Sequence, residues 1–285
     1  MKKLIISSAL GLLLSCSVAP AQDLKIEEKI KKEFDMSNLK TLSIHNLSGF
    51  IKVEGYAGSK IMLEIDQTIS AENQAEFQKG KDQFELGFDQ NTDSLIVYIK
   101  EPWDSRPNSH KNDWNKKERV DYHYHLDFTV KVPYAMNLNV STVNNGNISI
   151  ANVAGSLKIN NVNGAIALEN IKGKTSVRTV NGNVDVSYAE NPPGDSDYYT
   201  LNGDLTITYP ANLSADCEYK SFNGELFTDF PEVQILPARI SQNTNKHGGS
   251  TKYKLQSNTL FQIGKGGKNL HFETFNGNIY IKKQS

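Results

Sequence analysis

Gly146-Asn-Ile-Ser-Ile-Ala-Asn-Val-Ala154 opens a run of nine-residue units that continues to Tyr188. The second unit is Gly155-Ser-Leu-Lys-Ile-Asn-Asn-Val-Asn163, and further units begin at Gly164, Gly173 and Gly182. They share the template Gly-x-Φ-x-Φ-x-x-Φ-x, where Φ is apolar, and Thr175 is the residue that breaks it. A fixed short period of this kind predicts a repeat architecture in which each unit packs on its neighbours.

The spacing within a unit predicts a short strand followed by a bend. Φ-x-Φ has the period of two that is typical of a half-buried strand, and the next apolar residue comes three positions later. A hairpin meander is the rival geometry, because Asn-Gly favours two-residue turns. A hairpin around Asn163-Gly164 would point Ile166 away from Val162. A β-arc, which turns the chain without pairing its arms, lets both side chains face one interior, so a β-solenoid is favoured.

The corners of this solenoid are predicted at the glycines. Asn-Gly recurs at every second unit, so one coil is two units, and later copies of the motif are spaced slightly wider. Glycine and asparagine both tolerate positive φ, and stacked asparagine amides can hydrogen-bond along a corner. The expected corner residues are Asn145, Gly146, Gly155, Asn163, Gly164, Gly173, Asn181, Gly182, Asn202, Gly203, Asn223, Gly224, Asn276 and Gly277.

The N-terminus is typical of a bacterial export signal. Lys2 and Lys3 precede an apolar run that is too short for a membrane span, and Ala19-Pro20-Ala21 fits signal cleavage after Ala21. A buried N-terminal helix is the alternative for this stretch. Leu13-Leu-Ser-Cys16 also resembles a lipobox, so lipidation at Cys16 and outer-membrane anchoring remain an alternative to soluble export into the periplasm or to the cell surface.

Composition limits the function further. The 31 basic and 32 acidic residues give a net charge of −1, which offers little attraction to nucleic acid. Apart from Cys16, Cys217 is the remaining thiol, so an internal disulfide framework is excluded and a buried, unreactive thiol is expected. Gly264-Lys-Gly-Gly-Lys268 lacks the spacing of a phosphate-binding loop, and no cofactor is indicated.

The N-terminal part reads as strands around one helix. Residues 26–34 suit a short helix or an extended lead-in strand, and residues 71–83 predict a helix with Ser70 as its N-cap. Residues 84–88 and 95–99 predict a hairpin. We therefore expect a signal peptide at 1–21 and a single β-solenoid domain at 22–285, with a repeat core at 137–228 and a C-terminal cap at 255–283.

A polar insertion at 101–119 interrupts the strands and holds Trp103 and Trp114. Long loops on rigid scaffolds often carry binding, and tryptophan is frequent at interfaces. The alternative is that the two rings only clamp the loop to the sheet.

The strand that follows this insertion holds a candidate metal site. Asp121, His123, His125 and Asp127 alternate onto one face. Imidazole and carboxylate groups at this spacing can bind a divalent metal, although an ordinary strand with one solvated face has the same sequence pattern.

The whole pattern resembles a known family. Val140-Ser-Thr-Val-Asn-Asn-Gly146, Val162-Asn-Gly164, Val180-Asn-Gly182 and Phe275-Asn-Gly277 look like the bacterial domain-of-unknown-function 4097 family of candidate adhesins with β-strand repeats. The cell-surface head domains called GIN are similar. The resemblance implies an all-β, right-handed β-helix with coils of about 18–21 residues, a place in the cell envelope and no catalytic motif.

Three functions follow as hypotheses. The first is an exported, non-catalytic protein that binds a surface protein or a glycan. The second is an envelope scaffold that self-associates through its end coils, because open ends of a solenoid must be capped or paired. The third is a metal-assisted or carbohydrate-active enzyme on a β-helix scaffold.

Overall fold

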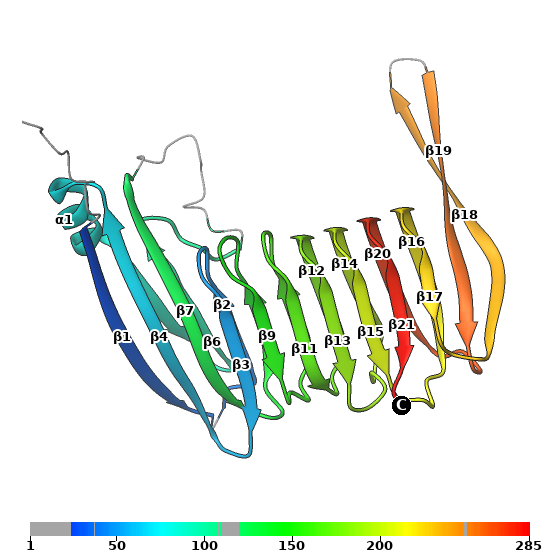
Figure 1. Cartoon of the computed structure of the whole chain (residues 1–285), viewed down its shortest axis with the longest axis horizontal. Helices are drawn as coiled ribbons and strands as arrows, with labels where there is room; N and C mark the ends of the chain where they lie inside the picture. Colours follow the sequence, from blue (N-terminus) through cyan, green and yellow to red (C-terminus); the bar gives the residue numbers. More distant parts are fainter. Residues whose placement is uncertain (1–23, 37, 108, 110–119, 248–249) are drawn as a thin grey trace, which may run out of the picture.

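The computed structural model describes residues 24–36, 38–107, 109, 120–247 and 250–285. In this part of the chain the strands form two sheets that face one another, as the long row of arrows in Figure 1 shows. Sheet A has ten strands, in the order β1 (Leu24–Asp35), β4 (Lys60–Ala71), β7 (Tyr122–Pro133), β3 (Ile51–Tyr56), β9 (Ile148–Ala151), β11 (Ile166–Ile171), β13 (Val184–Tyr188), β15 (Leu205–Tyr209), β21 (Ile279–Lys283), β17 (Leu226–Thr228). Sheet B has eleven, in the order β18 (Val233–His247), β19 (Ser250–Ile263), β16 (Ala215–Asn223), β20 (Lys268–Asn276), β14 (Ser196–Asn202), β12 (Thr175–Asn181), β10 (Leu157–Asn160), β8 (Asn137–Ser141), β2 (Thr41–His45), β6 (Ser94–Glu101), β5 (Glu85–Gln90).

Strands of successive coils pair in parallel, as a β-arc solenoid requires. Ile148 lies opposite Ile166, which lies opposite Val184, so each partner lies two repeat units further along the chain. No hairpin forms at Asn163-Gly164, because β10 pairs within sheet B and β11 within sheet A. The prediction of stacked coils over a hairpin meander is confirmed, and the chain is all-β apart from one helix in the described residues.

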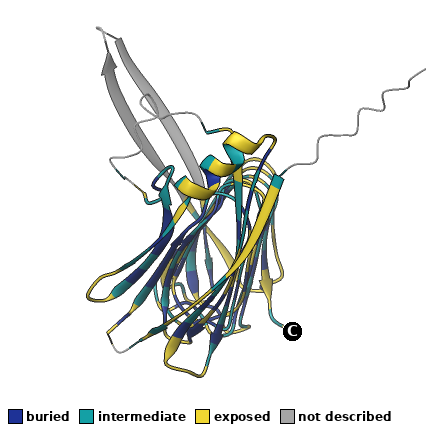
Figure 2. Cartoon of the chain, turned by 90° about the vertical axis from the view of Figure 1, so that its left-hand side faces the viewer, coloured by how far each residue is buried: buried dark blue, intermediate teal, exposed yellow. Residues whose placement is uncertain are grey.

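The core lies between the sheets. The alternating apolar residues of each short strand point inward, and Ile166, Val184 and Leu205 have no solvent exposure. Figure 2, which looks along the row of strands, shows buried and intermediate residues along both walls and exposed residues mainly on α1, on β1 and at the turns. Most of the folding free energy therefore comes from aliphatic side chains stacked from coil to coil, at about 1.5–3 kcal/mol for each side chain fully buried.

The N-terminal end is closed by irregular elements. Residues 24–35 form the edge strand β1, not a short helix, and β1 pairs antiparallel with β4. The helix α1 (Gln74–Gln83) begins later than expected, because Asn73, not Ser70, is the N-cap and its side chain accepts the Glu76 N–H. The predicted hairpin is present as the antiparallel pair β5 and β6.

The coils do not stack in the order of the chain. The coil of β20 and β21 lies between the coil of β14 and β15 and that of β16 and β17. Residues 268–283, which the sequence placed in a C-terminal cap, therefore lie inside the stack. The end of the molecule is formed by β16, β17 and the hairpin of β18 and β19, which projects from the row in Figure 1.

Candidate functional site

The Asn-Gly corners stack along one long edge of the molecule, which we call the Asn-Gly edge. Each corner carries the chain from a strand of sheet B to a strand of sheet A. Asparagine side chains on successive coils donate to one another at 2.8 Å, in the ladder Asn163 to Asn144, Asn181 to Asn163, Asn202 to Asn181, Asn276 to Asn202 and Asn223 to Asn276. Each of these bonds uses one donor and one acceptor site of an amide, so each group retains capacity for a partner.

One corner differs from its sequence prediction. The ladder uses Asn144, whereas Asn145, the residue next to Gly146, has a left-handed backbone with φ of 57°. This corner contains one extra residue, and asparagine tolerates the left-handed conformation that absorbs it. The Asn145 amide instead lies 3.4 Å from the hydroxyl of Ser48.

The interior of each corner is polar, which the repeat template did not predict. Thr179 and Thr200 are buried, and their hydroxyls donate to the carbonyls of Gly164 and Gly182 at 3.0 and 2.8 Å. The same contact is made by Thr142 to Gly49, Asn161 to Gly146 and Thr274 to Gly203. Bends leave carbonyls without a ladder partner, and buried carbonyls need a donor. A Thr or Asn before Asn-Gly is the sequence signal for this arrangement, and the corner at Asn223-Gly224, where Ser221 holds the position, lacks the contact.

Because threonine or asparagine takes the inward position, the apolar residue after it faces out. Val162 and Val180 were expected in the interior, but they are only partly buried, at the surface of the Asn-Gly edge. The prediction holds only at the opposite corners, where Val153 and Ile171 are fully buried. The apolar residues at this position form a continuous row, the apolar ridge, made of Leu47, Val143, Val162, Val180, Leu201, Phe275 and Phe222. Leu47, at the start of the ridge, also packs against the core.

The apolar ridge ends in two phenylalanines. The rings of Phe275 and Phe222 stack at 4.7 Å with an interplanar angle of 6°, and they are 44% and 73% exposed. Neighbouring strands are about 4.8 Å apart, so the six steps from Leu47 to Phe222 span about 29 Å. The ridge therefore offers an elongated apolar strip beside a parallel row of amides.

Glycine is needed at these corners mainly for close approach. A Cβ on Gly182 would lie 2.3 Å from the carbonyl oxygen of Gly164 in the preceding coil. Gly203 adds a φ of 153°, where side chains are strained, but Gly182 does not lie in that region. The expected positive φ therefore applies to some corners, and stacking distance accounts for the rest.

A groove lies at the start of the apolar ridge. It has a volume of about 390 Å³, and its lining includes Leu47, Val143, Trp103 and Tyr124. Trp103 comes from the 101–119 insertion, which occupies the corner position between β6 and β7. Trp103 therefore lies beside Leu47 and Val143 in one groove on this edge of the molecule.

The first part of the insertion is clamped to sheet B. The Ser105 hydroxyl donates to the His45 carbonyl at 2.6 Å and accepts the Ile99 N–H at 2.8 Å. The buried Asp104 accepts the guanidinium of Arg106 at 2.6 Å, which holds the pKa of this carboxyl below its usual range against the opposing effect of burial. Arg106 also lies 4.0 Å above the Tyr98 ring. Trp103 is thus held in place, while Trp114 lies outside the described residues.

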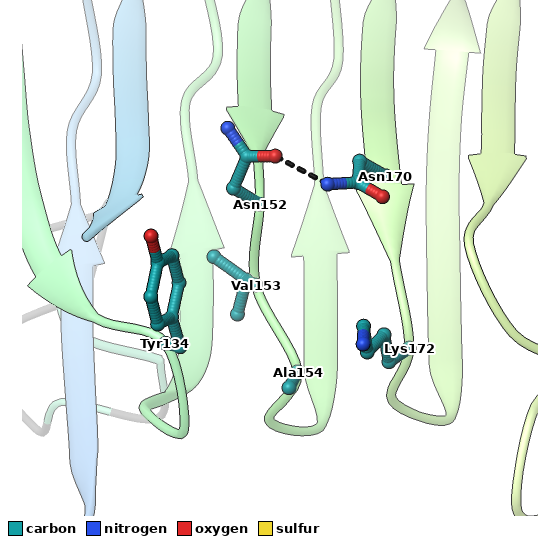
Figure 3. Close-up of a pocket in the computed structure, with 6 residues that line it drawn as sticks. All are labelled: Tyr134, Asn152, Val153, Ala154, Asn170 and Lys172. Atoms are coloured by element: carbon teal, nitrogen blue, oxygen red, sulfur yellow. Dashed lines mark hydrogen bonds between the residues drawn. The ribbon is translucent and has the colours of Figure 1, made fainter. Parts of the chain in front are cut away.

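The opposite edge is different in character. A hollow of about 310 Å³ lies there. Its lining includes Tyr134, Asn152, Asn170 and Lys172, which Figure 3 shows as sticks. The Asn170 amide donates to Asn152 at 2.5 Å, and Lys172 forms an ion pair with Glu190 at 2.6 Å. Val153 belongs to the core, but the exposed Tyr134 and Ala154 also line the hollow, so this edge offers a small hollow of mixed polar and apolar character rather than a strip.

The candidate metal residues are not brought together as a metal centre. His125 lies 2.9 Å from Asp127, whose carboxylate also accepts the Phe50 N–H at 3.0 Å. Asp121 lies just before β7 and His123 near its start, and both positions are exposed. Among the residues described, no group of three or more His, Cys, Asp or Glu is placed to hold a metal ion.

Two further features of the chain bear on its chemistry. Cys217 is buried in the core, and burial raises the pKa of its thiol to about 12, which keeps it protonated and unreactive. Within the described ranges, no helix is long and apolar enough to cross a membrane. Cys16 and Ala21 lie outside the described residues.

Comparison with known proteins finds no match among curated proteins. Among solved structures, the chain is similar to a candidate cell adhesion protein from Clostridium sporogenes, with 11% identity, a TM-score of 0.45 and coverage of 91% of this chain and 100% of that one. It is also similar to a candidate adhesin from Bacteroides fragilis, with 9% identity, a TM-score of 0.35 and coverage of 90% and 97%. A candidate lipid-binding protein from Parabacteroides distasonis is similar with 11% identity and a TM-score of 0.26, and the match covers 90% of this chain and 97% of that one. The model of the Toastrack DUF4097 family matches residues 23–260, well over half of the 285 residues, and the chain therefore belongs to that family.

Proposed function

We propose that this chain is an exported, non-catalytic protein of the bacterial cell envelope that binds an elongated surface partner, a protein or a glycan, along its Asn-Gly edge. In this proposal the chain is a right-handed β-helix with coils of about 18–21 residues. Cleavage after Ala21 releases it into the periplasm or to the cell surface, and lipidation at Cys16 is the alternative mode of attachment.

The apolar ridge is the observation that carries the proposal. Contiguous exposed apolar surface is uncommon on soluble proteins and marks sites of interaction. The ridge runs across the coils, and the amide ladder runs beside it at the same repeat of about 4.8 Å. A partner that lies along the edge gains apolar contacts and hydrogen bonds together. Trp103 in the groove adds an aromatic contact at one end.

The chemistry of the edge favours binding over turnover. The ridge and the ladder contain aliphatic, aromatic and amide side chains, which recognise a partner but supply neither a nucleophile nor an acid-base pair. The near-neutral chain, with a net charge of −1, also supports contact-based recognition rather than attraction by charge.

The test replaces two outward residues of the ridge. Val162→Asp with Leu201→Asp puts charges into the apolar strip without touching the core. The matched control, Ser149→Asp with Thr206→Asp, changes half-buried positions on the outer face of sheet A. Labelled protein is titrated onto intact bacterial cells, isolated envelopes and a glycan panel.

We expect the ridge variant to bind at least tenfold more weakly than the wild type, and the control variant to bind equally well. Tenfold corresponds to about 1.4 kcal/mol, less than the burial of two aliphatic side chains contributes. Equal binding by both variants would remove the ridge from the proposal. Turnover of an envelope substrate by the wild type would contradict its non-catalytic part.

A further inference from the structure

The amide ladder has a direction, and it ends at the groove that Trp103 lines. Each ladder amide from Asn223 to Asn163 donates to the asparagine of the neighbouring coil on its N-terminal side of the stack. Asn144 is the last acceptor, and in the described part of the chain its own amide nitrogen donates to no other group. Hydrogen bonds in a chain polarise one another, so the amide at the end of the ladder is a stronger donor than an isolated one.

The ladder stops here because the neighbouring coil has a serine at the equivalent position. Ser48 and Asn144 form an isolated backbone bridge. The Ser48 hydroxyl lies 3.4 Å from the Asn145 amide nitrogen and 3.3 Å from Nδ1 of His125, so it is already engaged. Ser48, Asn144 and Asn145 all line the groove. The N–H groups of the Asn144 side chain are therefore free to bind a ligand that enters the groove.

Three aromatic side chains, Trp103, Tyr122 and Tyr124, line the same groove. The Tyr122 hydroxyl donates to the side chain of Gln83 at 3.2 Å, and the Tyr124 ring packs on Phe84 with ring centroids 5.0 Å apart. Trp103 is held by the clamp that follows it in the chain. Because these side chains are held before a ligand arrives, little conformational entropy is lost when it binds.

The groove favours an uncharged ligand. Among its described lining residues there is no aspartate, glutamate, lysine or arginine, and His123 and the two tyrosines are its titratable groups. Burial raises the pKa of Tyr124 to about 12, so this phenol stays neutral at ordinary pH. A charged ligand would lose water here without gaining a partner of opposite charge.

A sugar ring matches this set of groups. The C–H groups on one face of a pyranose pack on the negative face of an aromatic ring. Its hydroxyls both donate and accept, as amides and a serine hydroxyl do. An extended peptide binds mainly through its main chain to a strand edge, whereas the unpaired donor here is a side-chain amide. The volume of about 390 Å³ is near the lower end for small-molecule sites, which suits one or two rings.

We propose that this groove binds one or two sugar residues of a neutral glycan, with one ring against Trp103 and a hydroxyl oxygen that accepts from the Asn144 amide. Further sugars of the same glycan lie along the amide ladder. This inference rests on the proposed function, because it names the partner of the Asn-Gly edge as a glycan and places one end of that glycan in the groove.

The experiment titrates the full chain with neutral disaccharides and trisaccharides, with sulfated saccharides of the same length and with an array of apolar peptides. Calorimetry measures affinity. Trp114→Phe leaves Trp103 as the one tryptophan of the chain, so its fluorescence reports on the groove. The groove variants are Trp103→Ala and Asn144→Ala. Asn212→Ala on the opposite edge is the matched control, because this exposed side chain also accepts an asparagine amide from another coil.

We expect saturable binding of at least one neutral saccharide, with a shift in Trp103 emission. Affinity should fall at least tenfold in Trp103→Ala and about fivefold in Asn144→Ala, and it should not change in Asn212→Ala. Asn144→Ala changes an exposed side chain, so it keeps the test valid if Trp103→Ala does not fold. Absence of saturable binding, binding of sulfated saccharides or peptides alone, or equal affinity in both groove variants and the wild type would each overturn the proposal.

The same variants separate this inference from the proposed function. If the ridge variant Val162→Asp with Leu201→Asp loses envelope binding while no saccharide binds, the glycan inference is wrong and the proposed function stands. If the groove variants lose saccharide binding while the ridge variant binds envelopes like the wild type, the glycan inference is supported and the ridge is removed from the proposed function.

Discussion

Replacing two inward threonines by valine tests what orients each Asn-Gly corner. Thr179 and Thr200 lie in successive coils and donate to the carbonyls of Gly164 and Gly182 at 3.0 and 2.8 Å. Both side chains are almost fully buried. Valine has the same shape as threonine, so Thr179→Val with Thr200→Val removes the two hydroxyls without creating a cavity.

The expected loss is about 2 kcal/mol for the pair. A buried acceptor that loses its donor costs about 1–3 kcal/mol. The new methyl group contributes about 0.8 kcal/mol through burial, which offsets part of that loss. The net change is therefore about 1 kcal/mol at each position. For a domain of about this size, 1 kcal/mol lowers Tm by roughly 2–4 °C, so the double variant should melt roughly 4–8 °C below the wild type.

The matched control is Thr206→Val with Thr208→Val, because both threonines lie half-buried on the outer face of β15. Outward substitutions usually change stability by no more than about 0.5 kcal/mol each. Both double variants are melted by circular dichroism and calorimetry beside the wild type. If the inward pair melts within the range of the outward pair, the hydroxyls do not hold the corners, and the stated reason for the outward ridge is wrong.

Two further predictions concern stability. Gly182→Ala should lower the free energy of unfolding by about 1–3 kcal/mol, because its Cβ would lie 2.3 Å from the Gly164 carbonyl oxygen. Gly194→Ala is the control and should change this free energy little, because its nearest contact would be at 3.7 Å. Equal Tm values for the two variants would contradict the close-approach argument. Burial, with the charge of Arg106 as a second cause, lowers the pKa of His45 to about 4, so the unfolded chain binds a proton that the folded chain does not. Stability should therefore fall by up to about 3 kcal/mol as the pH drops from about 6.5 to 4, and urea unfolding of His45→Gln should lack this part of the pH dependence.

The repeat in the sequence was enough to predict stacked coils. The period from Gly146 to Tyr188 requires equivalent backbone positions at every second unit, and the parallel pairing of Ile148, Ile166 and Val184 follows from it. The hairpin of β5 and β6 was also predictable, because it depends on local alternation and a short turn. Local patterns of this kind depend only on residues that are close together in the chain.

The direction of the ridge required knowledge of hydrogen bonds between coils. An apolar residue such as Val180 is expected inside on hydropathy alone, but the bent corner leaves a carbonyl in the interior, and the hydroxyl of Thr179 satisfies it. Which of these two neighbours points inward is decided by the preceding coil, which supplies the carbonyl of Gly164. Hydropathy along one chain segment does not contain that information.

The order of the coils was decided only by the tertiary structure. The corners at Asn202-Gly203, Asn223-Gly224 and Asn276-Gly277 are nearly equivalent in sequence, so each could stack on any other. The fold places the last of these between the first two, through pairings over 74 and 53 residues. That choice leaves β17 and β18 at the end of the molecule. Long-range pairing depends on which edges remain free when the chain returns, and no local pattern in the sequence specifies this.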